Sequence, residues 1–66
     1  MTKIEKNRTD YTTRLEDLKY NLDELLEFLD HCDLGLTHFA HVYSTNQVIN
    51  LSLAIDHLLK AAKDCD

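Results

Sequence analysis

The fold of this chain is decided by residues 48–62, which read VINLSLAIDHLLKAA. Ten of these fifteen residues are apolar. Five of them recur at alternating spacings of three and four, which places them on one side of an α-helix: Val48, Leu51, Ile55, Leu58 and Ala62. Ile49 and Leu53 fall on the nearly opposite side, roughly 120–160° away around the helix axis. One neighbouring helix cannot cover both sides, so the stretch predicts a helix with more apolar surface than a single partner buries.

A matching pattern precedes this helix, as a seven-residue repeat made by Tyr11, Leu15, Leu18, Leu22, Leu25, Leu29 and Cys32. Between the two patterns lie the only glycine, Gly35, and a candidate N-cap, Thr37. The sequence therefore predicts an all-α, antiparallel, coiled-coil-like two-helix hairpin in a single domain, 1–66. Helix one covers about 9–32, the turn 33–37 and helix two about 38–63. The predicted seam sets Leu15, Leu18, Leu22, Leu25 and Leu29 against Leu51, Ile55, Leu58 and Ala62.

Two helix boundaries stay open at this point. Capping-box patterns that begin at Thr2 and at Thr13 both offer a start for the first helix. A third such pattern, which begins at Ser44, offers a break in the second helix. If the second helix is unbroken, one further stripe lines up on it, made by Phe39, Val42, Ile49 and Leu53.

Composition excludes several classes of function. The chain has 66 residues and a net charge of −5, with twelve acidic residues against seven basic ones. Nucleic acids and anionic membranes are bound by basic surfaces, so neither is an expected partner. No run of 18 apolar residues predicts a membrane span, and the first residues lack the apolar core of a signal peptide. We therefore expect a cytoplasmic protein.

One side of the first helix is strongly acidic. A single base, Lys19, stands among seven acids: Glu16, Asp17, Asp23, Glu24, Glu27, Asp30 and Asp33. These acids either form a solvated surface or attract a basic partner.

Cysteine and histidine residues gather near the turn, at His31, Cys32, His38 and His41. Their spacing fits no known zinc finger, so we expect no metal and no other cofactor. The two cysteines, Cys32 and Cys65, fall some tens of Å apart in a hairpin, which predicts free thiols.

No catalytic arrangement is apparent, because nothing in the sequence places a base beside Ser52, and a two-helix chain offers little concavity for a substrate. We expect a non-enzymatic protein that binds another protein, or a second copy of itself. The predicted partner surface is the stripe of Phe39, Val42, Ile49 and Leu53.

The chain resembles the YscE/EscE-like family, the small helical-hairpin co-chaperones of type III secretion needle subunits. The resemblance lies in the opening Met-Thr-x-x-Glu, in NLDELLEFL over residues 21–29 and in LSLAIDHLL over residues 51–59. It implies a bacterial cytosolic hairpin that pairs with a helical-repeat chaperone and keeps a needle subunit unpolymerised. The family has no catalytic residues.

The chain is also similar to the short sporulation phosphatases that act on the aspartyl phosphate of response regulators. Their motif is Ser-Gln-Glu-Leu-Asp, and here Ser52, Ile55 and Asp56 stand in a stretch that lacks the Gln and Glu. This resemblance implies a phosphatase in which Asp56 is the residue to test. A homodimeric four-helix-bundle regulator is a further alternative.

Overall fold

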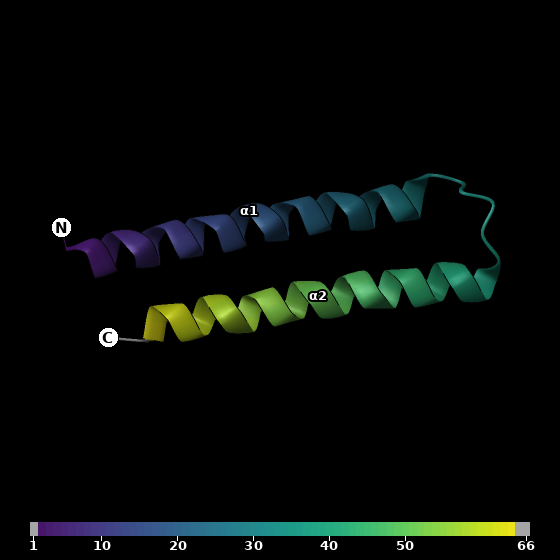
Figure 1. The fold of residues 1–66 in the computed structure, drawn as a ribbon. Coiled ribbons are helices and arrows are strands. Elements are labelled where there is room, and N and C mark those ends of the chain that lie inside the picture. Colours follow the sequence, from purple (N-terminus) through teal and green to yellow (C-terminus); the bar gives the residue numbers. More distant parts are fainter. Residues whose placement is uncertain (1, 65–66) are drawn as a thin grey trace.

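The computed structural model describes residues 2–64, which form two long α-helices joined by a short connection. Helix α1 spans Lys3–His31 and helix α2 spans His38–Asp64. The helices lie antiparallel, so the start of α1 and the end of α2 share one end of a rod that measures 50 × 16 × 11 Å (Figure 1). The predicted all-α hairpin is confirmed. Neither described helix is long and apolar enough to cross a membrane.

Helix α1 begins at Lys3, which corrects the predicted start near residue 9. The cause is the first capping box, in which the Glu5 backbone N–H donates a hydrogen bond to Thr2 Oγ1 at 3.2 Å. Thr13 lies inside the helix. At the other end, the Cys32 N–H donates to the Phe28 carbonyl at 2.9 Å and closes the last turn.

The connection between the helices is organised by three side-chain and backbone features. Gly35 has a φ of +68°, in the left-handed region that glycine tolerates best. Its N–H donates to Asp33 Oδ1 at 2.9 Å, which tightens the turn. Thr37 Oγ1 accepts a hydrogen bond from the Ala40 N–H at 3.2 Å, so Thr37 caps α2 as predicted. Helix α2 then continues through Ser44 without a break.

The core of the hairpin is small. Among the described residues, only Leu15, Leu29, Val48 and Ile55 are buried, and each keeps between 5% and 8% of its surface exposed. Other apolar residues of the seam are half-buried, namely Leu22, Leu26, Leu59 and Ala62. Several remaining seam positions hold polar side chains that are also half-buried, and these include Thr12, Lys19, Thr45 and Ser52. The two helices thus pack through an apolar seam that polar side chains interrupt at several positions.

Four residues of the predicted seam lie outside it. Leu18, Leu25, Leu51 and Leu58 are between 45% and 55% exposed, so their assignment to the hairpin core was wrong. The seam of α1 instead follows Leu15, Leu22 and Leu29 together with positions 12, 19 and 26. Each apolar stripe is wider than the strip that one neighbouring helix covers. The hairpin therefore buries one edge of each stripe and leaves the other edge exposed.

Candidate functional site

One exposed apolar stripe runs along α2, away from the hairpin seam. It consists of the predicted partner-binding residues Phe39, Val42, Ile49 and Leu53, and we call it the outer stripe. Because α2 is continuous, the four side chains align along one side of the helix. Their exposed fractions run from 39% at Ile49 to 79% at Phe39. The Phe39 ring stacks on Tyr43, with ring centroids 6.3 Å apart, which holds it on the helix surface.

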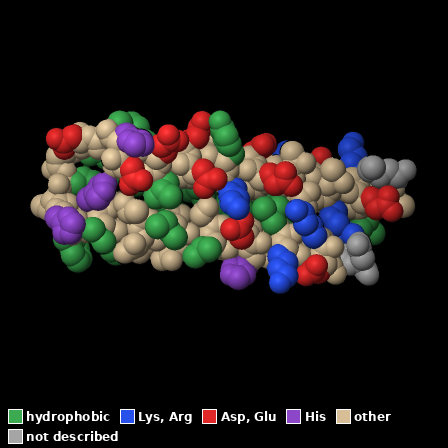
Figure 2. Space-filling view, turned by 180° about the vertical axis from the view of Figure 1, so that it is seen from behind, with side chains coloured by type: hydrophobic (Ala, Val, Ile, Leu, Met, Phe, Trp, Pro, Cys, Tyr) green, Lys and Arg blue, Asp and Glu red, His purple; other side chains and the backbone are tan. Residues whose placement is uncertain are grey.

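A line of acids on α1 lies beside the outer stripe. Asp23, Glu27 and Asp30, which we call the acidic flank, are all exposed. Helical spacing turns them toward the same side of the hairpin as Val42 and Ile49. Figure 2 looks onto this side, with red acidic side chains along α1 and green apolar side chains along α2. The surface therefore combines negative charge on one helix with apolar area on the other.

One ion pair crosses between the helices on this side and sets their register. Lys19 Nζ donates a hydrogen bond to Asp56 Oδ1, which joins the middle of α1 to the second half of α2. This hydrogen bond is the main cause that raises the pKa of Lys19 above its ordinary value. With Lys19 opposite Asp56, Leu18 lies near the height of Leu58 and Leu25 near the height of Leu51.

The other side of the hairpin carries a second apolar surface, which we call the apolar face. In antiparallel helices, the positions four residues before each main seam position point to the same side. Five of the six positions hold large apolar residues that are exposed, and the sixth, four residues before Val48, is the half-buried Ser44; the five are Tyr11, Leu18, Leu25, Leu51 and Leu58. The sequence pattern contained them but assigned four of them to the core. The missed signal was that Leu15, Leu22 and Leu29 belong to two overlapping stripes.

The α2 half of the apolar face has uncharged neighbours, whereas charged residues border its α1 half. On the α2 side, the neighbouring positions are Tyr43, Gln47, Ala54 and Ala61. On α1, Asn21 and Phe28 flank Leu25 and Arg14 flanks Leu18, while Asp17 and Glu24 directly precede Leu18 and Leu25 and border the apolar face at its outer edge. The acidic flank therefore lies on one side of the hairpin, and the opposite side is uncharged on α2 but bordered by acids on α1.

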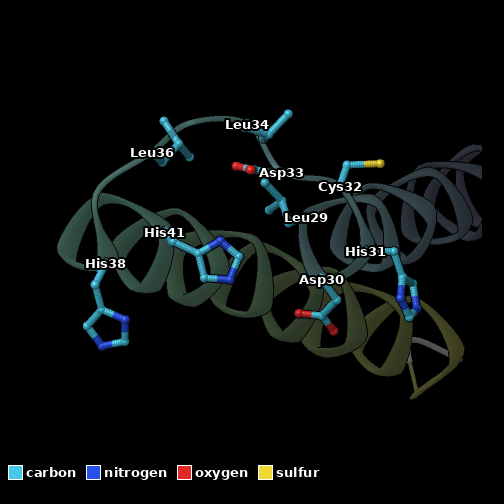
Figure 3. A pocket seen from close by; sticks show the side chains of 9 residues that line it. All are labelled: Leu29, Asp30, His31, Cys32, Asp33, Leu34, Leu36, His38 and His41. Carbon is cyan, nitrogen blue, oxygen red and sulfur yellow. The ribbon is translucent and has the colours of Figure 1, made fainter.

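A cavity of about 540 Å³ lies at the turn and contains the cluster noted in the sequence. Its lining includes His31, Cys32, His38 and His41. Figure 3 shows the imidazoles of His31 and His38 on opposite sides of the cavity, with Cys32 directed elsewhere. Within residues 2–64, no three His, Cys, Asp or Glu side chains converge as metal ligands. Cys32 is a free, exposed thiol, and Cys65 lies outside the described residues.

The residues of the phosphatase resemblance are held in the hairpin seam or next to it. Ser52 is half-buried between the helices, and Ile55 is one of the buried core residues. The Asp56 carboxylate is engaged by Lys19. No observation in this geometry favours a phosphatase over a binding module.

Comparison of the chain with known protein families, curated proteins and solved structures finds no match. The function must therefore be argued from the two exposed surfaces of the hairpin.

Proposed function

We propose that this chain is a non-enzymatic protein-binding hairpin that holds a basic amphipathic helix of a partner along the outer stripe. The observation that supports this most directly is that the acidic flank lies beside the outer stripe on the same side (Figure 2). A partner helix with apolar residues on one side and Lys or Arg along its edge matches both features.

The outer stripe and the acidic flank contribute differently to the proposed binding. Val42, Ile49 and Leu53 supply apolar area, which stabilises a complex by about 25 cal/mol for each Å² removed from water. Asp23, Glu27 and Asp30 supply charge, which speeds encounter and selects a basic partner more than it adds affinity. The binding mode is that of a helix that packs against a helical surface with anchors three and four residues apart.

The resemblance to needle-subunit co-chaperones gives this proposal a biological setting. In that setting the protein is cytoplasmic, and its partner is a helical-repeat chaperone, the secretion subunit or both. The observed antiparallel hairpin supports the setting, because the resemblance implies the same fold. Copurification of the tagged chain with such a chaperone and needle subunit from the native host tests it. If neither protein copurifies, the co-chaperone role is refuted. The proposal that the outer stripe binds a basic helix is tested separately.

The binding proposal is tested with a synthetic helical peptide that carries leucines along one side and lysines along both edges. A fluorescent label on the peptide reports binding by anisotropy. We expect Leu53→Asp to weaken binding at least tenfold, because the aspartate interrupts the apolar contact. Leu51→Asp is the matched control, since it places the same charge on the other side of the same helix.

The control also separates specific docking from simple charge attraction. If the peptide bound only because the protein is acidic, both substitutions would strengthen binding equally. If Leu51→Asp weakened binding as much as Leu53→Asp, the outer stripe would not be the docking surface. A version of the peptide with glutamates in place of the lysines is expected to bind at least tenfold more weakly, and equal binding would remove the acidic flank from the proposal.

A further inference from the structure

The isolated hairpin exposes more surface than a compact chain of its mass. Its accessible surface is 5384 Å². A folded monomer of 7.7 kDa is expected to expose about 4,300 Å², so the excess is about 1,000 Å². One partner in a standard protein–protein interface buries about 800 Å². The hairpin therefore has enough uncovered surface for one complete interface beyond its own seam.

The apolar face is arranged so that it can pack against itself. The Lys19–Asp56 register places Leu18 and Leu58 at one height of the hairpin and Leu25 and Leu51 at another, and these two layers are seven residues, or about 10 Å, apart. A twofold axis parallel to the face brings the two layers of one chain onto the two layers of another. If the axis runs along the helices, each layer meets its own counterpart. If it runs across them, each layer meets the other layer. Closed dimers of identical chains use such self-complementary patches more than any other arrangement.

The charge distribution allows a second copy at this face. The chain carries a net charge of −5, which would oppose association if the acids met across the interface. The acidic flank, however, lies on the other side of the hairpin, and the positions beside Leu51 and Leu58 are uncharged. A partner with a basic surface would find no acidic group on this part of α2, and a second copy docked there brings Asp17 and Glu24 only to the outer edge of the interface.

We propose that a second copy of this chain docks on the apolar face and forms a four-helix bundle. Its new core consists of Leu18, Leu25, Leu51, Leu58 and their counterparts in the second copy. The outer stripe and the acidic flank then face outward on both sides of the bundle. The dimer and the docking of a basic helix use different surfaces, so either proposal can fail without the other.

Sedimentation equilibrium at roughly 10 and 100 µM protein tests the proposal, because the dimer fraction rises with concentration. We expect a mass twice that of the 7.7 kDa chain at the higher concentration. Leu51→Asp and Leu18→Asp are expected to halve this mass and to keep the helical circular dichroism, since both side chains are exposed within one hairpin. Leu53→Asp is the matched control and is expected to leave the mass unchanged.

Three results would overturn the dimer. They are a monomeric wild-type chain at the higher concentration, a dimer that survives both Leu51→Asp and Leu18→Asp, and a dimer that Leu53→Asp disrupts instead. If either variant at the apolar face unfolds, the melting temperature of the wild-type chain, measured at several protein concentrations, shows whether the chain is a dimer. It must rise with protein concentration for a dimer, and a constant value contradicts the proposal.

Discussion

Truncation of Ile55 is the sharpest test of the seam, because the structure separates this residue from apolar neighbours on the same helix. Ile55 is 5% exposed, whereas Leu51, one turn earlier, is 55% exposed. Loss of a buried isoleucine to alanine costs about 2–4 kcal/mol, and loss of a half-exposed leucine costs about 1 kcal/mol or less. A chain of 66 residues has a total stability of roughly 3–10 kcal/mol, so Ile55→Ala removes a large share of it.

Urea denaturation followed by far-UV circular dichroism measures this difference. With a slope near 1 kcal/mol per molar urea, Ile55→Ala should lower the midpoint by roughly 2–4 M and Leu51→Ala by less than about 1 M. Both substitutions are made in the Leu18→Asp background, so that loss of a dimer does not add to the effect of Leu51→Ala. Equal midpoints for the two variants, or a larger effect of Leu51→Ala, would show that the seam runs through the stripe first expected from the sequence.

Three further predictions concern polar groups of the hairpin. The pKa of Lys19 is raised by Asp56, so the stability from this pair is complete below about pH 10.5 and is lost as the pH rises through the folded-state pKa. The urea midpoint should therefore fall more steeply above that pH in the wild type than in Lys19→Met. If the midpoint depends on pH in the same way in both proteins, the ion pair does not stabilise the fold. Thr45 Oγ1 is buried and has no hydrogen-bond partner among the described residues. Thr45→Val should raise the stability by about 1 kcal/mol, and a loss of stability in thermal or urea melts would refute this. The turn should need no metal, so neither zinc nor a chelator should shift the melting temperature, and stoichiometric zinc in the purified protein would contradict this.

The hairpin itself could be predicted because local signals and periodicity agree. Gly35 and Thr37 mark the connection, and the long apolar repeats on either side exclude short helices or strands. The predicted cap at Thr37 is present, and the predicted second helix differs from α2 by one residue at its end. The start of α1 was placed too late, because Arg8 interrupts the apolar pattern while the cap at Thr2 lies before it.

The rotation of the helices about their own axes could not be predicted. Leu15, Leu22 and Leu29 fit a seam with Leu18 and Leu25 as well as one with positions 19 and 26. Apolar content favours the first seam, and the structure has the second, with the Lys19–Asp56 pair at its edge. Sequence periodicity measures how apolar a side is, whereas the choice between two overlapping stripes depends on the partner helix. For the same reason the sequence showed excess apolar surface on α2 but not the apolar face that both helices share.

The two sides of the hairpin are proposed to have different occupants, a basic helix on the outer stripe and a second copy of the chain on the apolar face. Amide NMR spectra of the ¹⁵N-labelled chain, recorded during titration with the lysine–leucine peptide, test it residue by residue. We expect shifts along the outer stripe and the acidic flank, at residues such as Asp23, Glu27, Val42, Ile49 and Leu53. Dilution of the protein without the peptide should instead shift the signals of Leu18, Leu25, Leu51 and Leu58. Peptide-induced shifts centred on this second group, or the same set of shifts in both experiments, would contradict the assignment of different occupants to the two sides.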